Sequence, residues 1–326
     1  MSRAGSGGVQ HSDPRCALDA RGAKMGRMET SPPSGSSPAP ARPEPAGVPA
    51  GHDAVALEAA VAAQLTGLGR FGVAYSGGVD SATLLAVAVR ALGADRVVAI
   101  LGISPSLAAD ERAAAHEVAA VIGARVVEIE TREGERAAYI ANGPDRCFHC
   151  KDELFATIDA SVAGDLGLDA IAYGENADDA ARIDRPGAQA ATDHRVLRPL
   201  ADAGLTKAQV RELARALELP CADKPAAPCL ASRIPHFEEV TPAKLAAVEA
   251  AEKALRELGF SDSRVRHHGD VARIEVPEDE VAQAVTRRHE VNAAVRAAGF
   301  RYATLDLAGL QSGAFTLTVL AGGSRG

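Results

Sequence analysis

Apolar and polar residues recur along most of the chain with the spacings of helices and strands. From Ala54 to Leu68 the apolar residues have helical spacing, and a short β-rich segment, Phe71–Tyr75, follows. Predicted helices over 81–92, 110–122, 152–162 and 207–217 then alternate with predicted strands over 97–103, 126–129 and 170–173. Such alternation is typical of right-handed βαβ units that build a parallel sheet covered on both faces. The sequence therefore predicts an α/β fold, with residues 54–238 as one domain.

The order of the predicted elements changes after Pro242. A helix to about Leu258 precedes an apparent hairpin, whose strands cover 264–266 and 272–276. A helix to about Ala298 and a strand over 302–307 complete the pattern. This order predicts a smaller α+β domain over residues 242–326, with the boundary near 235–242.

The first fifty residues have a different composition. They hold eight of the 18 prolines, together with Gly- and Ser-rich stretches. Such a segment buries too little apolar surface to offset the entropy of ordering it. We expect residues 1–50 to form a disordered tail.

Composition narrows the classes of function. The net charge of −8 and an aromatic content of 3% argue against nucleic-acid binding, which relies on basic surfaces and stacking side chains. No apolar run approaches the roughly 18–20 residues that a membrane span requires, so we expect a cytoplasmic protein without a membrane partner. Five cysteines are too few for a disulfide scaffold of this length, and clustered cysteines then more often serve metals or catalysis.

A glycine-containing hexapeptide lies between the first predicted strand and the next helix. Two glycines allow a tight turn, and the helix N-terminus offers free N–H groups to an anion. A Walker P-loop would need a lysine that this segment lacks. The sequence therefore predicts a different phosphate loop, in which Asp80 orients the loop or takes part in a magnesium site. The residues of this loop are Ser76, Gly77, Gly78, Val79, Asp80 and Ser81.

The phosphate loop resembles the pyrophosphate loop of the ATP pyrophosphatases. Members of that superfamily cleave ATP between the α and β phosphates and adenylylate a substrate. They include GMP and NAD synthetases, argininosuccinate synthetase and tRNA thiolation enzymes. The resemblance implies a parallel-sheet ATP pyrophosphatase fold that uses ATP and magnesium.

Three cysteines are candidate ligands or sulfur carriers. Cys147 and Cys150 form a C-x-x-C that we expect just ahead of a helix, and Cys229 follows much later. The pair alone is compatible with half of a zinc site, completed by His149, with a redox pair or with an iron–sulfur clamp. Three thiolates on a four-iron four-sulfur cluster would leave one iron open. We interpret Cys221 as a small buried apolar residue and Cys16 as part of the tail.

Short motifs along residues 54–313 carry a more specific resemblance. They include Asp145-Arg-Cys-Phe-His-Cys-Lys151, Tyr173-Gly-Glu-Asn-Ala-Asp-Asp179 and Pro228-Cys-Leu-Ala-Ser-Arg-Ile-Pro235, with further matches at 184–187, 205–207, 223–225, 265–270, 272–275 and 304–307. Together they resemble the ATP-dependent sulfur transferases of the LarE type, which make the nickel-pincer nucleotide cofactor. Phe237 departs from that pattern where we expect Gly, and Leu310-Gln311 depart from an expected Tyr-Arg.

The resemblance implies roles for the cysteines. The residue matching Cys229 donates sulfur and becomes dehydroalanine in members with one cysteine. Members that also carry the pair matching Cys147 and Cys150 hold an iron–sulfur cluster. The chain would then replace a carboxylate of a small pyridinium nucleotide with a thiocarboxylate, and the resemblance makes a homo-oligomer plausible.

Arginines near the third cysteine are candidate anion ligands, because a guanidinium binds oxyanions in bidentate fashion. Ser232 and Arg233 follow Cys229 closely. Arg264 and Arg266 are two apart on a predicted strand, which places them on one face. By resemblance these four residues contact the substrate; alternatively, Arg264 and Arg266 form an exposed basic face of the strand. Asp179 is a candidate magnesium ligand or, alternatively, a helix cap.

Three functions remain open from the sequence. The first is sulfur insertion into pyridinium-3,5-biscarboxylic acid mononucleotide. The second is tRNA thiolation by the same loop and cysteine chemistry, which the acidic charge disfavours. The third is a non-catalytic nucleotide-binding or iron–sulfur protein, which leaves the arginines around Cys229 unexplained.

Overall fold

A computed structural model describes residues 53–182 and 186–310 of the chain. The contacts divide the chain after Val48, and all described residues belong to the second unit, Pro49–Gly326. The expected tail over residues 1–50, Cys16 and Gln311 lie outside the described residues. The expectations for these segments stay predictions.

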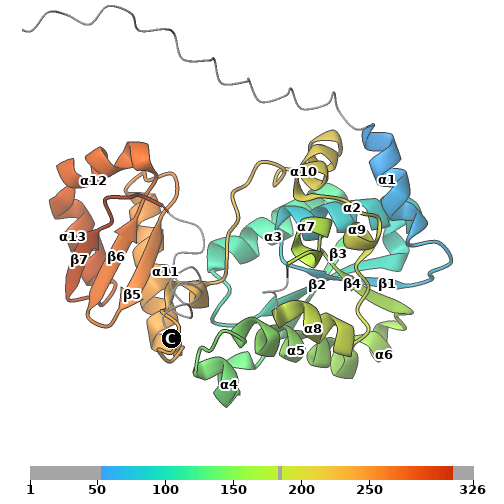
Figure 1. Ribbon diagram of the computed structural model, residues 1–326, viewed down its shortest axis with the longest axis horizontal. Helices are drawn as coiled ribbons and strands as arrows, with labels where there is room; N and C mark the ends of the chain where they lie inside the picture. The colour runs from blue at the N-terminus through green and yellow to red at the C-terminus, as the bar shows by residue number, and fades with distance from the viewer. Residues whose placement is uncertain (1–52, 183–185, 311–326) are drawn as a thin grey trace, which may run out of the picture. The chain divides into compact units, whose positions relative to one another are not determined.

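The first sheet has four parallel strands in the order β3-β2-β1-β4. They are β1 (Phe71–Tyr75), β2 (Val97–Ile103), β3 (Arg125–Glu130) and β4 (Ala170–Tyr173). Ala74 of β1 lies opposite both Ile100 of β2 and Tyr173 of β4. The parallel sheet confirms the predicted α/β fold (Figure 1).

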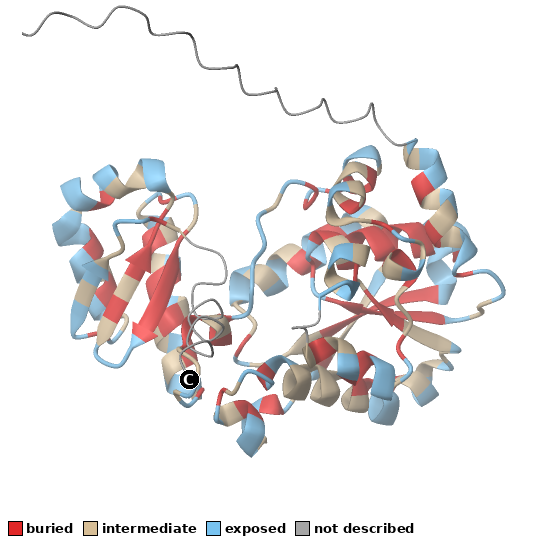
Figure 2. Ribbon diagram, viewed as in Figure 1, coloured by how far each residue is buried: buried red, intermediate tan, exposed pale blue. Residues whose placement is uncertain are grey.

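Helices cover both faces of this sheet, and alternate residues of the strands pack against the two layers. Val73 and Ala99 belong to the core beneath α1 (Ala54–Ala63), α2 (Val79–Leu92), α3 (Ala109–Ile122) and α10 (Lys207–Ala216). Ala74 and Ile100 belong to the core beneath α5 (Arg146–Ile158) and α8 (Pro186–Asp193). The inner strands β1 and β2 are therefore mostly buried, as Figure 2 shows in red.

Short elements connect these layers. They are α4 (Ala137–Ile140), α6 (Gly164–Leu166), α7 (Ala177–Ala180), α9 (Pro199–Asp202), a π-turn over Asp159–Ala163 and 3₁₀ turns over Ala94–Arg96, Glu133–Glu135, Leu230–Arg233 and Glu278–Glu280. None of the helices in the described part of the chain combines the length and apolar character that crossing a membrane requires.

The second sheet has three strands in the order β5-β6-β7. β5 (Arg264–His268) and β6 (Val271–Glu275) form the predicted hairpin, and β7 (Tyr302–Leu305) joins β6 in parallel. The helices of this part of the chain are α11 (Pro242–Glu257), α12 (Val281–Thr286) and α13 (Arg288–Ala297). The single helix predicted to end near Ala298 is therefore two helices, α12 and α13. The core of this sheet also includes Tyr139 and Leu230, which come from earlier in the chain.

One predicted helix start was wrong. We expected the C-x-x-C to precede a helix that begins at Asp152, but α5 begins at Arg146 and holds both cysteines in its first turns. The polar run from Asp145 to Lys151 masks the helical period in the sequence. Cys147 and Cys150, three residues apart on a helix, therefore share one side of it.

Candidate functional site

The phosphate loop connects β1 to α2 at the edge where the strand order reverses between β1 and β4. Ligands of open α/β sheets bind at this type of edge. Gly77 has φ +72°, and an added Cβ there would lie 2.7 Å from the Cβ of Ala115. Gly78 is the N-cap of α2, and Gly78, Val79 and Asp80 line the cavity described below. The hydroxyl of Ser81 donates to Gly78 O (3.1 Å) and accepts from Ser76 N (3.2 Å), so the loop holds its own shape.

A polar cluster lies over the phosphate loop. Asp80 pairs with Lys207, and Asn176 Nδ2 donates to both Asp80 Oδ1 (3.2 Å) and Asp179 Oδ2 (2.8 Å). Asn176, rather than Asp179, caps α7, because Asn176 Oδ1 accepts from Asp179 N. Asp80 and Asp179, the two carboxylates that accept from Asn176, offer oxygen ligands of the kind that magnesium uses together with phosphates.

A cavity of about 490 Å³ includes both the phosphate loop and Cys229. Its walls come from the loop and α2, from the segment after β2, from α10, from the segment before Leu230 and from α11 and β5. Its residues include Ser76, Gly78, Val79, Asp80, Ser106, Lys207, Arg211, Lys224, Cys229, Arg233, Glu252 and Arg264. One cavity therefore joins two motifs that lie about 150 residues apart in the sequence.

Charged residues line this cavity, and several of its cations pair with carboxylates. Lys224 pairs with Glu111 at 2.7 Å, and Arg256 pairs with Asp110 at 2.5 Å. Arg264 donates to the carbonyl of Ala226 at 3.0 Å. Burial, together with the charge of Arg233, lowers the pKa of Arg264. An anion bound in the cavity would raise the pKa of Arg264 and so oppose both effects.

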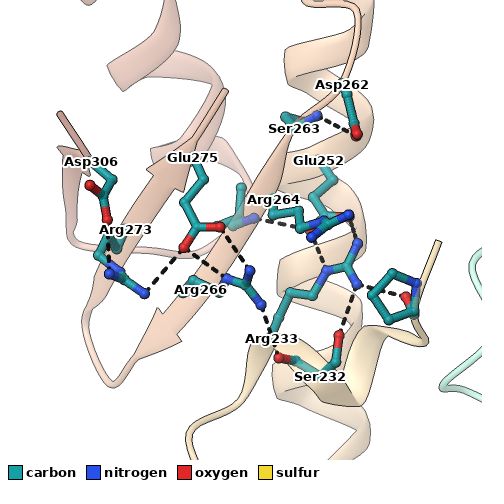
Figure 3. A network of polar contacts seen from close by, with 12 residues as sticks. Ser232, Arg233, Glu252, Asp262, Ser263, Arg264, Arg266, Arg273, Glu275 and Asp306 are labelled. Carbon is teal, nitrogen blue, oxygen red and sulfur yellow. Dashed lines mark hydrogen bonds and ion pairs between the residues drawn. The ribbon is translucent and has the colours of Figure 1, made fainter. Parts of the chain in front are cut away.

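Two other arginines form buried ion pairs (Figure 3). Arg233 donates to both carboxylate oxygens of Glu252 of α11, from Nε at 2.8 Å and from Nη2 at 3.2 Å. Arg266 contacts Glu275 at 3.0 and 2.7 Å and donates to Ser232 O at 3.2 Å. These pairs attach the segment after Cys229 to α11 and to the second sheet. Ser232 and Arg266 are absent from the lining of the cavity, so their contact with a substrate stays a prediction.

The charges of the three candidate cysteines affect one another's pKa values. Cys147 and Cys229 are exposed and Cys150 is half-buried. Burial raises the pKa of the Cys150 thiol, and the charges of Cys229, Glu133 and Cys147 act in the same direction. Cys229 is exposed as a residue, but burial of its thiol raises the thiol pKa. The charge of Arg146 opposes this shift.

Arg146 is a buried cation whose charge acts on these thiols. It is 8% exposed, and its Nη1 donates to Asn142 Oδ1 (2.6 Å) and Ala231 O (2.9 Å). Burial lowers its pKa, but the charges of Cys229 and Cys147 outweigh burial and leave the pKa raised. Across the described ranges, no three His, Cys, Asp or Glu side chains are close enough to hold a single metal ion.

Asn142 is a structural residue that sequence reasoning missed. It has φ +56°, and its Nδ2 donates to the carbonyls of Ile234, Pro235 and Glu238. Phe237 also has a positive φ, of +67°. This backbone region favours glycine, which agrees with the Gly expected at this position. The only available signal for Asn142 was the Asn-Gly-Pro sequence, which is typical of a turn.

Cys221 lies apart from these thiols. It is 2% exposed and belongs to the core beneath α1, α2 and α10. Its burial fits the interpretation of a small apolar residue.

Comparison with known proteins gives a consistent result. The family described as asparagine synthase matches residues 54–164. A Synechocystis protein described as uncharacterized is 42% identical over 243 residues, 74% of this chain and 90% of that protein. The pyridinium-3,5-bisthiocarboxylic acid mononucleotide synthase of Lactiplantibacillus plantarum is 35% identical over 262 residues, 78% of this chain and 92% of that protein. The parallel sheet and its loop agree with a PP-loop ATP pyrophosphatase fold. This chain therefore belongs to the family of the pyridinium-3,5-bisthiocarboxylic acid mononucleotide synthase.

Proposed function

We propose that this protein is an ATP-dependent sulfurtransferase that converts a carboxylate of pyridinium-3,5-biscarboxylic acid mononucleotide into a thiocarboxylate, in nickel-pincer cofactor biosynthesis. The observation that carries the proposal is the single cavity that contains both the phosphate loop and Cys229. A substrate bound in this cavity would contact both motifs. The name of the Lactiplantibacillus relative supports the class of substrate.

The first step is adenylylation at the phosphate-loop end. A substrate carboxylate oxygen attacks the α-phosphorus of ATP, and the bond to the β-phosphate oxygen breaks to release pyrophosphate. The N–H groups at the start of α2 bind the departing pyrophosphate, and Lys207 adds positive charge beside Asp80. Asp80 and Asp179 would hold magnesium together with the phosphates of ATP.

The second step occurs at the cysteine end. A hydrosulfide sulfur attacks the acyl carbon of the adenylate, the carbon–oxygen bond to AMP breaks, and a proton is released with the thiocarboxylate. Arg264 and Arg233 line this part of the cavity and suit the remaining anionic groups of the substrate. AMP is the leaving group because it departs more easily than hydroxide.

Cys147, Cys150 and Cys229 would hold a four-iron four-sulfur cluster. Each thiolate of such a cluster binds a different iron, so the three sulfurs need not converge on one point. The mutual effects of the thiols on their pKa values support a common location. When bound, the cluster supplies an iron without a protein ligand, where sulfide can bind.

The test measures pyrophosphate released from ATP with the pyridinium biscarboxylate as substrate, under anaerobic conditions. We expect release with this substrate and none with tRNA. Pyrophosphate release with tRNA alone would favour the tRNA thiolation hypothesis. No pyrophosphate release with either substrate would contradict the proposal that the protein is this enzyme.

A second assay tests the cluster. Anaerobically prepared protein should contain iron and acid-labile sulfide, lose both on Cys147→Ala, Cys150→Ala or Cys229→Ala, and turn over repeatedly with sulfide. Zinc in place of iron would contradict the cluster. One sulfur transferred per chain, with Cys229 converted to dehydroalanine, would assign the protein to the single-turnover class.

The homo-oligomer stays a prediction.

A further inference from the structure

One of the serines that line the cavity has a hydroxyl without a partner among the described residues. The serines of the lining are Ser76, Ser106 and Ser263. Ser76 Oγ lies 3.2 Å from Ser81 Oγ, and Ser106 Oγ donates to Glu133 Oε1 at 2.9 Å. Ser263 is 2% exposed, and its Oγ has no hydrogen-bond partner in the described part of the chain. Because buried polar groups in proteins are almost always paired, we expect its partner in the molecule that occupies the cavity.

The neighbouring residue, Asp262, differs in a similar way from the other carboxylates of the cavity. Asp262 Oδ1 accepts from Ser263 N at 2.8 Å, but across residues 53–182 and 186–310 Asp262 forms no ion pair. Every other carboxylate of the lining is paired with a cation. The pairs are Asp80 with Lys207, Asp110 with Arg256, Glu111 with Lys224 and Glu252 with Arg233.

Asp262 and Ser263 lie immediately before β5, in the same region as the buried pair of Arg233 and Glu252 (Figure 3). Val265 N, two residues after Ser263, donates to Glu252 Oε1 at 2.9 Å. The hydroxyl and the carboxylate are thereby connected to the segment that follows the sulfur-donor cysteine, and not to the phosphate loop.

A ligand group that suits both residues has to carry hydrogen-bond donors. The charge of Asp262 disfavours the carboxylates and the phosphate of a pyridinium nucleotide, and the ring nitrogen of such a nucleotide carries no hydrogen. Its ribose hydroxyls both donate and accept hydrogen bonds, and a carboxylate binds ribose hydroxyls in many dinucleotide sites.

We propose that Asp262 and Ser263 bind the ribose hydroxyls of the pyridinium nucleotide, with Asp262 accepting from one hydroxyl and Ser263 Oγ donating to the other. This inference rests on the proposed function and adds the residues that select a ribonucleotide.

The experiment measures binding by calorimetry to the full chain, without ATP. The ligands are pyridinium-3,5-biscarboxylic acid mononucleotide and its 2′,3′-dideoxyribose analogue. Ser263→Ala should bind the mononucleotide about fivefold more weakly than wild type, the loss of one neutral hydrogen bond, and should bind the analogue as wild type does. Asp262→Asn should bind the mononucleotide about tenfold more weakly, because the lost hydrogen bond involves a charged group. Ser261→Ala, at an exposed position outside the lining of the cavity, is the matched control and should bind both ligands as wild type does.

Thermal unfolding without ligand checks the premise. Ser263→Ala should match or exceed the wild-type Tm, because its hydroxyl forms no hydrogen bond within the described residues. A lower Tm would show that the hydroxyl already has a partner in the protein and would overturn the inference.

Three binding results would also overturn the inference. An equal loss of affinity for both ligands in Ser263→Ala would show that the ribose hydroxyls are not its partners. Wild-type affinity of Ser263→Ala for the mononucleotide is what a bridging water would give. Weaker binding of ATP alone to Ser263→Ala would assign the hydroxyl to the ribose of ATP instead.

The pyrophosphate assay on wild type separates the two proposals. Pyrophosphate release with the mononucleotide, combined with wild-type binding by Ser263→Ala, contradicts only this inference. Selective loss of mononucleotide binding in Ser263→Ala, without pyrophosphate release by wild type, contradicts only the proposed reaction. No binding of the mononucleotide by wild type would contradict both proposals.

Discussion

The two ends of the cavity are built in different ways. The phosphate loop takes six consecutive residues, and its serines bond to one another and to the loop backbone. At the cysteine end, Cys229 from the segment before Leu230 lines the cavity, while Cys147 and Cys150 of α5 are not among its lining residues. The loop is complete within itself, while the cysteine end depends on long-range contacts.

This difference separates two kinds of site. The hydrogen bonds that shape the loop come mostly from its own residues, so substitutions of its polar side chains should affect binding with little effect on folding. An assembled site shares its residues with the core, as Leu230 does. Substitutions around it should change stability and function together.

The largest expected effect is that of Asp80→Ala at the loop. Asp80 holds Lys207 and Asn176 over the phosphates, and its loss removes one carboxylate of the proposed magnesium pair. We expect pyrophosphate release to fall by about 100-fold or more, with little change in Tm. Asp95→Ala, an exposed site outside the cavity, is the control. Wild-type release by Asp80→Ala would remove this loop from the reaction.

The buried ion pair behind Cys229 should give the largest effect on stability. Glu252→Ala leaves Arg233 buried and uncompensated and takes an acceptor from Val265 N. We expect a loss of about 3–5 kcal/mol in the free energy of unfolding, measured in urea. Glu290→Ala breaks an exposed pair with Arg287, which solvent screens, and should cost far less. Equal losses in the two variants would show that the Cys229 segment is not held by this pair.

The sequence predicted correctly that this loop lies between a strand and a helix, because the loop is built from adjacent residues. Its residues are adjacent, and their spacing alone places them between a strand and a helix. The start of α5 and the role of Asn142 depend on contacts with residues about 90 positions away, which no local pattern contains. The sequence predicted the arginines near Cys229 as a group of candidate anion ligands. It did not predict the carboxylates that pair with two of them, Glu252 and Glu275.

An adjacent pair of glycines tests the loop on a finer scale. Gly77→Ala places a Cβ 2.9 Å from the backbone Cα of Ala115 at φ +72°, so we expect a loss of about 1–3 kcal/mol in stability. At Gly78 an added Cβ meets only Ser76 Oγ at 3.5 Å, so Gly78→Ala should leave Tm unchanged. A bulky residue at Gly78 should abolish adenylylation with the fold intact. Thermal unfolding checks the stability of both positions, and equal Tm values for Gly77→Ala and Gly78→Ala would refute the strain argument.

The smallest effect concerns how α5, with its cysteines, is held at its exposed side. His194 contacts Asp152 of α5 at 2.9 Å and Asp159 at 3.0 Å. Burial lowers the pKa of His194, but the two carboxylates outweigh it and leave the pKa above 6.5. Hydrogen bonds from Arg136 and His194 hold the pKa of Asp152 below 3.8.

The sign of the pH dependence follows from these two shifts. The His194 contribution is full below pH 6.5 and is lost as pH rises through the folded-state pKa, while the Asp152 contribution is lost as acid protonates the carboxylate. We therefore expect His194→Gln to cost up to about 1 kcal/mol near pH 5.5 and almost nothing near pH 9. Urea unfolding of wild type and variant at both pH values measures this difference. A cost that is the same at both pH values would mean that His194 supports α5 by packing against Phe155, whose ring centroid lies 5.9 Å away, rather than by its charge.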